Sequence, residues 1–298
     1  MSTEPNNIMS NAANLVRLMR PKQWVKNLFV FTGLLFSHAW GEADIVLKVL
    51  AAAAGFSLVS SAIYIINDIA DREADRRHPT KRQRPLASGA VNVRTALLLA
   101  ALLAVGGALL GAFASTTVLW LLAAYAVINL GYSAGLKQVV ILDVFIIAAG
   151  FMLRILAGTL GVGIPPSQWL LLTGLLITLF LGFAKRRAEW QAAGEEGASQ
   201  RKVLQHYGPE LLDHMITVAA AGVVMSYSLY TMSADTIARH GTENLVYTVP
   251  FVLYGIFRYI YLLHHRRRGE DPAGELLLDP HMAITFAGWL ATTVWLIA

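Results

Sequence analysis

Nine apolar stretches, separated by short polar or Gly/Pro-containing breaks, divide this sequence from end to end. A helix needs about 20 consecutive apolar residues to cross the hydrocarbon core of a bilayer, and most of the stretches approach that length. Because 56% of the 298 residues are hydrophobic and only 14% are charged, the chain is too apolar for a soluble protein of this size. We therefore expect an all-α integral membrane protein with nine transmembrane helices. The expected spans are residues 27–40, 47–67, 94–113, 116–134, 139–160, 167–185, 211–232, 245–264 and 281–297.

Lysine and arginine positions predict how the chain threads the membrane. Cytoplasmic segments retain positive charge, and with a cytoplasmic N-terminus, 20 of the 24 lysines and arginines fall on the cytoplasmic side. Only Lys48 and Arg239 fall outside, while Arg154 and Arg258 lie within spans. The net charge of +5 therefore follows from topology, and nucleic-acid binding is not needed to explain it.

The long, charged connections all lie on the predicted cytoplasmic side, so we expect the functional site to face the cytoplasm. They are an N-terminal segment at residues 1–26 and loops at 69–93, 186–210 and 265–280. The sequence has no evident internal repeat, which predicts a single domain over residues 1–298. We expect this to be a transmembrane catalytic domain in the inner (plasma) membrane. Because the chain has no cysteine, any metal ligands must be oxygen or imidazole.

An acidic motif ends the second predicted span. Residues 65–75 read Ile-Ile-Asn-Asp-Ile-Ala-Asp-Arg-Glu-Ala-Asp. If the helix continues at about 100° per residue, Asn67, Asp68, Asp71 and Asp75 share one face. Three carboxylates on one face repel each other unless cations neutralise them, and such oxygen ligands suit Mg²⁺ that also holds phosphate oxygens. We therefore predict a Mg²⁺ site at these four residues. The alternative is a solvated acidic helix end.

A basic loop follows the acidic motif directly. Lys81, Arg82 and Arg84 lie in it between two prolines, and such cations beside carboxylates can hold a polyphosphate together with a metal. The alternative is a cytoplasmic anchor on anionic lipid headgroups. Lys185, at the end of the sixth predicted span, has the same two interpretations: phosphate contact or helix-end anchor.

Two ionisable residues fall within the fifth predicted span. Asp143 and Arg154 are three helical turns plus about 20° apart, so they share a face. Ionisable residues inside a span usually face a cavity. Asp143 is near enough to the inner interface to join the metal site, and the segment from Tyr132 to Lys137 leads into it. Arg154 either lines the deep end of a cavity or extends toward the outer surface.

Other functions find less support. The chain lacks a Walker loop and a Rossmann glycine pattern in the required context, which argues against nucleotide hydrolysis and nicotinamide chemistry. His264 and His265 lie beside three arginines, without the paired spacing of a transition-metal site. A transporter would also contain charges within its spans, but inverted repeats are not evident.

The motifs resemble those of the UbiA superfamily of intramembrane prenyltransferases. The resemblance rests on the nine-span layout and on two motifs, Asn67-Asp68-x-x-Asp71-x-x-x-Asp75 and Lys81-x-x-Arg84-Pro85-x-x-x-Gly89. It implies a helical bundle with a polar cavity open to the cytoplasm, Mg²⁺ held by aspartates from two motifs, and a lateral opening for an isoprenoid chain.

Within the superfamily, the chain departs from the members that prenylate aromatic acceptors. Those members usually carry a second motif, D-x-x-x-D, whereas Asp143 is followed by Val-Phe-Ile-Ile. The chain is instead similar to the decaprenyl-phosphate phosphoribosyltransferase branch. The segments that carry this similarity are Arg20-Pro21-Lys22-Gln23-Trp24-Val25-Lys26-Asn27, Ala74 to Arg82, Tyr132-Ser133-x-x-Leu136-Lys137, Leu153-Arg154-x-x-Ala157-Gly158 and Lys185-Arg186-x-Ala188-Glu189.

This resemblance implies Mg²⁺-dependent transfer of 5-phosphoribosyl from phosphoribosyl diphosphate to a polyprenyl (decaprenyl) phosphate, for cell-envelope polysaccharide precursors. Asp68, Asp71 and Asp75 would be catalytic, and together with Asn67 and Asp143 would hold the metal. The implied substrate-binding residues are Lys22, Lys26, Asn67, Lys81, Arg84, Tyr132, Lys137, Arg154 and Lys185. The alternative is transfer of a prenyl group from prenyl diphosphate to an aromatic acceptor. Assembly of several copies of the chain into a homo-oligomer is compatible with either alternative.

Overall fold

The computed structural model describes residues 4–197, 202–265 and 278–297, and these residues form helices and their connections without a β-strand. The predicted all-α class is confirmed for this part of the chain. Among the described residues, eight helical segments are long and apolar enough to cross a membrane. They comprise α3 (Ala43–Ala70), α5 (Val93–Ala114), α6 (Thr116–Ala134), α7 (Leu142–Ala157) with η5 (Leu160–Val162), α8 (Gln168–Gly197), α9 (Pro209–Met232), η8 (Asn244–Thr248) with α11 (Val249–His265), and α13 (Pro280–Ile297).

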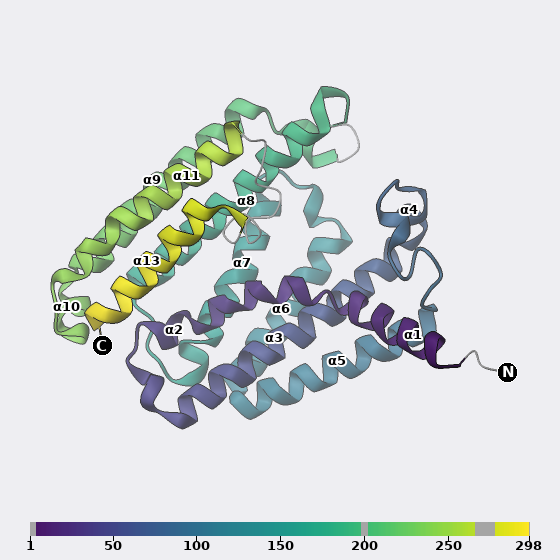
Figure 1. The fold of residues 1–298 in the computed structure, drawn as a ribbon, viewed down its shortest axis with the longest axis horizontal. Coiled ribbons are helices and arrows are strands. Elements are labelled where there is room, and N and C mark those ends of the chain that lie inside the picture. The colour runs from purple at the N-terminus through teal and green to yellow at the C-terminus, as the bar shows by residue number, and fades with distance from the viewer. Residues whose placement is uncertain (1–3, 198–201, 266–277, 298) are drawn as a thin grey trace.

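Helices that follow one another in the sequence mostly pack side by side (Figure 1): α3 against α5, α6 against α7, α7 against α8, α8 against α9, and α11 against α13. Buried apolar side chains form one cluster among α7, α8, α9 and α11. A second cluster joins α3, α6 and the end of α7. The short connections favour this arrangement, because a tight turn after one span places the next span antiparallel beside it.

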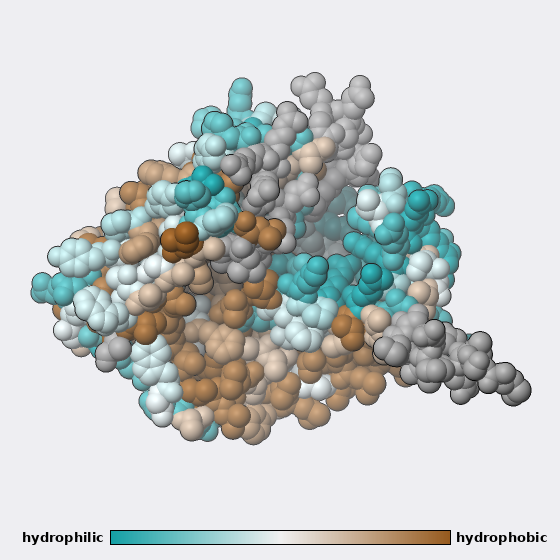
Figure 2. All heavy atoms as spheres, in the orientation of Figure 1, coloured by the Kyte–Doolittle hydropathy of each residue, from teal (hydrophilic) through white to brown (hydrophobic). Residues whose placement is uncertain are grey.

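Large apolar side chains lie exposed along the outside of the bundle, as on α5 at Leu98, Leu102 and Leu109 and on α6 at Trp120 and Val127. Figure 2 shows an apolar belt over the lower part of the molecule and polar residues around α4 (Arg72–Arg77). In water such a belt would be unfavourable, whereas in a bilayer it faces acyl chains.

Residues 21–41 lie alongside α3 as short 3₁₀ and α-helical pieces, so the single helix predicted at 27–40 is wrong in its geometry. The N-terminal segment consists of α1 (Glu4–Met19), the 3₁₀ helix η1 (Pro21–Phe31), α2 (Thr32–Leu35) and η2 (Ala39–Gly41). Trp24 Nε1 donates to Ser61 Oγ at 3.0 Å and Asn27 Nδ2 donates to Ser57 Oγ at 2.8 Å, so η1 runs antiparallel to α3. Since a 3₁₀ helix rises about 2.0 Å per residue, the eleven residues of η1 extend about 22 Å, against about 16 Å in an α-helix.

A backbone contact holds η1 and α2 against the end of α7. A Cβ added at Gly158 would meet the carbonyl oxygen of Val30, and one added at Gly33 would meet the carbonyl oxygen of Gly158. Only glycine permits two backbones to approach this closely. The contact fixes α7 relative to the N-terminal segment that carries Lys22 and Lys26.

The charged connections gather at one end of the bundle and differ in part from the predicted loops. Between α3 and α5 the chain forms α4 and η3 (Lys81–Gln83), while η4 (Leu136–Gln138) joins α6 to α7 and η7 (Lys202–His206) precedes α9. The predicted loop at 186–210 is wrong at its start, because α8 continues to Gly197. Of the predicted loop at 265–280, residues 266–277 lie outside the described residues. The short α10 (Ala234–His240) marks the opposite end (Figure 1).

Candidate active site

The acidic motif lies at the junction of α3 and α4, at the charged end of the bundle. The predicted continuous helix is interrupted, since α3 ends at Ala70 and α4 begins at Arg72. Helical hydrogen bonding nevertheless persists: the Asp71 N–H donates to the Asn67 carbonyl at 2.9 Å, and the Asp75 N–H donates to the Asp71 carbonyl at 2.8 Å. The shared helical face predicted for the four residues of the acidic motif is therefore partly retained.

Two of the four predicted ligands converge on a single point. Asp68 and Asp75 are both 4% exposed, and Arg84 Nη1 donates to Asp68 Oδ1 at 3.0 Å and to Asp75 Oδ2 at 2.7 Å. Asn67 is half-buried, and Asp71 is exposed at the helix junction. The Arg84 nitrogen thus stands where a cation would bridge the two buried carboxylates.

This pair fits a Mg²⁺ ion that shares its ligands with a substrate. Among the described residues, no group of three or more His, Asp or Glu side chains is placed to hold a metal. Mg²⁺ in phosphate-transfer sites is commonly held by one or two carboxylates together with substrate phosphates and water. Asp68 and Asp75 supply two hard oxygen donors around a point already filled by a positive group. The donor set therefore fits Mg²⁺ accompanied by phosphate.

Arg20 also contacts Asp68, although the sequence did not predict Arg20 as a substrate-binding residue. Its Nη2 donates to Asp68 Oδ1 at 2.5 Å, and its guanidinium lies 5.2 Å from the ring centre of Tyr64. Arg20 has left-handed backbone angles, φ 53° and ψ 58°, which are unusual for a non-glycine residue and place it at the break between α1 and η1. The sequence signal for the break between the two helices was Pro21, because the residue before a proline is disfavoured in an α-helix.

The basic loop is fixed to the helices that carry the aspartates. Arg72 Nε donates to the carbonyl of Leu86 at 3.2 Å, and Arg76 Nε donates to that of Ala87 at 3.2 Å. Leu86 and Ala87 are buried, so the loop has an apolar anchor beside Arg84. The loop is therefore an ordered element of the site.

The predicted lysines differ in exposure. Lys22 and Lys81 are exposed, whereas Lys26, Lys137 and Lys185 are half-buried. They lie on η1, η3, η4 and α8, which border the charged end.

Asp143 belongs to a separate ion-pair network. Its carboxylate accepts hydrogen bonds from Arg186 Nε at 2.7 Å and from the Tyr207 hydroxyl at 2.7 Å. Arg186 also donates to Glu189 at 2.6 Å and to the Tyr132 hydroxyl at 3.2 Å. Asp143 is fully buried and Arg186 is 1% exposed, so this ion pair is closed to solvent. The structure thus brings Asp143 and Tyr132 together, but through Arg186.

Tyr207 closes the network from the segment before α9. Its hydroxyl accepts the Ile141 N–H at 2.6 Å while donating to Asp143. Burial, together with the hydrogen bond to Asp143, raises the pKa of Tyr207 above its ordinary value of 10.0. Tyr207 therefore stays protonated and acts as a donor at neutral pH.

Arg154 is 4% exposed, which excludes its extension toward the outer surface. Its Nε donates to Asn27 Oδ1 at 2.7 Å, its Nη1 to the Gly150 carbonyl at 2.8 Å and its Nη2 to the Tyr125 hydroxyl at 3.1 Å. The guanidinium also lies 5.4 Å from the ring centre of Phe56 and 4.5 Å from that of Tyr125. Neutral acceptors and aromatic faces thus surround this buried cation.

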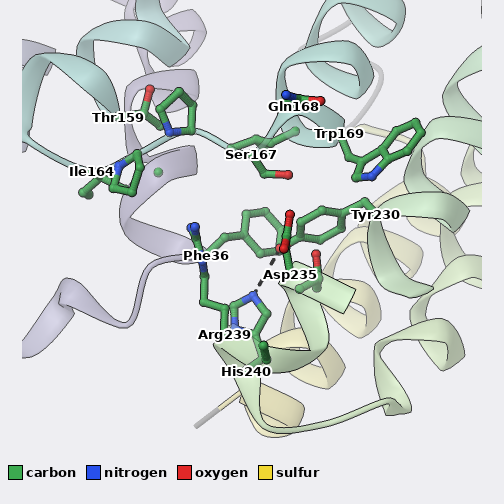
Figure 3. A pocket seen from close by; sticks show the side chains of 16 residues that line it. Phe36, Thr159, Ile164, Ser167, Gln168, Trp169, Tyr230, Asp235, Arg239 and His240 are labelled. Carbon is green, nitrogen blue, oxygen red and sulfur yellow. Dashed lines mark hydrogen bonds between the residues drawn. The ribbon is translucent and has the colours of Figure 1, made fainter. Parts of the chain in front are cut away.

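A pocket of about 460 Å³ lies at the opposite end of the molecule, between α8, α9 and α10 (Figure 3). His240 Nε2 lies 3.2 Å from the Tyr230 hydroxyl, and His240 Nδ1 lies 2.8 Å from His38 Nε2. Asp235 and Arg239 also line the pocket. Burial, followed by electrostatic interaction with His38 and Arg239, lowers the pKa of His240 to about 4. The pocket shares none of its lining with the acidic pair.

The fold and the charged end together define a helical membrane protein suited to binding a divalent cation with phosphate groups. The chain belongs to the UbiA prenyltransferase family, whose family model matches residues 27–278. The resemblance predicted from the motifs is thereby confirmed.

Two curated relatives are decaprenyl-phosphate phosphoribosyltransferases. The protein from Mycolicibacterium smegmatis is 36% identical over 299 residues, which cover 97% of this chain and 92% of the relative. The protein from Corynebacterium glutamicum is 37% identical over 256 residues, which cover 83% of this chain and 76% of the relative. The structure of a UbiA homolog from Archaeoglobus fulgidus bound to GPP and Mg²⁺ has the same fold, with a TM-score of 0.70 at 19% identity over 95% of this chain and 99% of that chain.

Proposed function

We propose that this protein transfers the 5-phosphoribosyl group of phosphoribosyl diphosphate to a polyprenyl phosphate, decaprenyl phosphate by analogy with its relatives. The main support is similarity along nearly the whole chain to relatives that carry this activity in their names. The buried carboxylate pair bridged by Arg84 supports it chemically, because it supplies donors for a cation and a guanidinium for a diphosphate.

The reaction is a displacement at C1 of the ribose. An oxygen of the lipid phosphate forms a bond to C1 while the bond from C1 to the diphosphate oxygen breaks, and the electron pair leaves with diphosphate. The lipid phosphate is already ionised at neutral pH, so no strong general base is required. Catalysis then depends on positioning and on stabilising the leaving group.

Each predicted residue has a proposed role in this displacement. Asp68 and Asp75, joined by Asn67 and Asp71 from the same motif, would hold Mg²⁺, which when bound neutralises the charge that builds up on the diphosphate. Asp143 is a weaker addition, because Arg186 and Tyr207 occupy its oxygens. The remaining residues are assigned to phosphate groups of the two substrates: Lys22, Lys26, Lys81, Arg84, Tyr132, Lys137, Arg154 and Lys185.

We also propose that the acidic end faces the cytoplasm, with a cytoplasmic N-terminus and nine membrane crossings in the inner membrane. The additional crossing would be the segment of η1 and α2, because η1 runs antiparallel to α3. The distribution of lysine and arginine supports this orientation. A soluble donor would then reach the site directly from the cytoplasm.

An activity assay with two substrate pairs tests the proposed function. Purified protein receives either phosphoribosyl diphosphate with decaprenyl phosphate or a prenyl diphosphate with an aromatic acid, each with and without Mg²⁺. We expect product only in the first mixture and only with Mg²⁺. Product in the second mixture alone would instead establish the prenyl-transfer alternative.

A further inference from the structure

Guanidinium groups occupy the carboxylate oxygens that the proposed function assigns to Mg²⁺. Arg20 and Arg84 share Asp68 Oδ1, and Arg84 also contacts Asp75. The two carboxylate side chains are each 5% exposed, and the two arginine side chains are each 30% exposed. Two positive charges therefore balance two buried negative charges, and each arginine keeps an edge toward solvent.

This balance disfavours Mg²⁺ on its own. A free Mg²⁺ would have to displace both guanidiniums, and the partly buried site would then carry two extra positive charges. Mg²⁺ that arrives with a diphosphate brings compensating negative charge. The displaced guanidiniums can then bind the phosphate oxygens, for which their forked geometry is well suited.

The position of Arg20 suits such an exchange. It lies at the break between α1 and η1, in a left-handed conformation that costs backbone energy in a non-glycine residue. Its contacts with Asp68 and with the ring of Tyr64 compensate that cost. Arg84 lies on a different element, the loop after η3, so two independent segments hold the same carboxylate.

We propose that Arg20 and Arg84 are exchange counter-ions. In the donor-free protein they neutralise Asp68 and Asp75 and keep the metal out. When the metal arrives with the diphosphate, they release the carboxylates to the metal and bind the diphosphate oxygens. Metal and donor therefore bind together, instead of metal first. This inference rests on the proposed role of the acidic pair and assigns a role to Arg20.

Binding of Mn²⁺ to the purified full-length protein tests the exchange without any turnover. Mn²⁺ replaces Mg²⁺ and is followed by its electron paramagnetic resonance signal, with inorganic diphosphate as the second ligand. For the wild-type protein we expect weak Mn²⁺ binding alone and binding on the order of tenfold tighter with diphosphate. Diphosphate affinity should rise by the same factor with Mn²⁺. Equally tight Mn²⁺ binding with and without diphosphate would overturn the proposal.

Two variants test the arginines separately. Arg20→Gln and Arg84→Gln should each raise Mn²⁺ affinity in the absence of diphosphate and reduce the gain that diphosphate gives. The matched control is Arg77→Gln, which removes the same charge from an exposed position on α4. If Arg20→Gln and Arg84→Gln bind Mn²⁺ no tighter than Arg77→Gln, the arginines do not compete with the metal. A purely structural role would lower Mn²⁺ affinity in both states and would also contradict the proposal.

The test separates this proposal from the proposed function. Inorganic diphosphate is the leaving group of both phosphoribosyl and prenyl transfer, so the Mn²⁺ measurement gives the same answer for either donor. Should one variant fail to fold, the other reports on the same carboxylate from a different segment, and the wild-type titration needs neither.

Discussion

Arg154 on α7 donates from Nε to Asn27 Oδ1 on η1 at 2.7 Å, joining two segments 127 residues apart in the sequence. Asn27 in turn donates from Nδ2 to Ser57 on α3. One buried cation thus links three membrane elements through a single amide side chain. The stability of the N-terminal 3₁₀ segment should depend on this link.

Replacing Arg154 by alanine should therefore destabilise the fold as well as any phosphate contact. The change removes three hydrogen bonds and leaves Asn27 Oδ1 unpaired, at a cost of about 2–4 kcal/mol. Thermal unfolding of Arg154→Ala, Asn27→Ala and the double variant should show a coupling energy above about 0.5 kcal/mol. The exposed Arg94→Ala is the control. Additive effects would show that the pair does not act together.

Asp71 offers the cleanest test of the acidic motif, because it is exposed at the α3–α4 junction and its removal leaves no buried arginine unpaired. Asp71→Asn should lower turnover by about 100-fold or more, as expected for loss of a ligand to the Mg²⁺ that would neutralise the charge of the leaving diphosphate. Its melting temperature should stay close to that of the wild type. Glu73→Gln, which removes an exposed acid paired only with Arg76 among the described contacts, should retain activity. Near-normal turnover of Asp71→Asn would remove Asp71 from the metal site.

Replacing Asp143 tests whether this residue is an ion-pair partner or a metal ligand. Asp143→Asn removes a partner of the buried Arg186 and should destabilise the protein by about 3–5 kcal/mol. Asp143→Asn combined with Arg186→Gln should cost less than the sum of the two single changes. Mn²⁺ binding in the presence of diphosphate should be retained by the folded variant. Its loss in a folded Asp143→Asn protein would instead make Asp143 a metal ligand.

The sequence predicted the membrane-crossing elements well because their signal is local. Eight of the expected spans coincide with long apolar helices. The place of Arg154 within a span left two alternatives, and its burial favours the position inside the bundle. The 3₁₀ geometry of η1 was not predictable, because apolar content does not distinguish a 3₁₀ from an α-helix. The sixth span was expected to end at Lys185, but α8 continues for about three more turns and Arg186 is buried.

The missed contacts of the site are nonlocal. Arg20 and Asp68 are 48 residues apart, and Arg186 and Asp143 are 43 apart. Motif spacing within one segment predicted that Asp68 and Asp75 share a face, but it contained no information about which cation from another segment would meet them. The αL conformation of Arg20 also depends on tertiary contacts, since the residue before a proline ordinarily prefers extended geometry.

Acid should weaken the end of the molecule that carries the His240 pocket. The pKa of His240 is lowered to about 4, so the unfolded chain takes up a proton at higher pH than the folded protein. The stability contributed by neutral His240 is full above about pH 6.5 and is lost as pH falls toward 4. The groups that face His240 are His38, Tyr230 and Arg239, with Asp235 across the pocket.

The half-burial of His240 limits the expected loss to the order of 1 kcal/mol. The melting temperature should therefore fall by a few degrees between pH 7.5 and pH 5, and His240→Gln, which does not titrate, should lose most of this difference. The same fall in both proteins would place the acid sensitivity elsewhere.

The absence of native cysteine makes topology directly measurable. Ser88→Cys, in the exposed loop before α5, and Glu243→Cys, in the exposed connection after α10, each supply a single thiol. A membrane-impermeant maleimide added from outside should label Glu243→Cys at once, but Ser88→Cys only after permeabilisation. The reverse pattern would invert the proposed orientation.

The most direct measurement is the stoichiometry of the proposed transfer. Purified protein is given phosphoribosyl diphosphate, decaprenyl phosphate and Mg²⁺, and both products are quantified by mass spectrometry. We predict one phosphoribosylated lipid phosphate for each diphosphate released, with neither formed by Asp75→Asn. Diphosphate release without lipid product, or full activity in Asp75→Asn, would contradict phosphoribosyl transfer at the acidic pair.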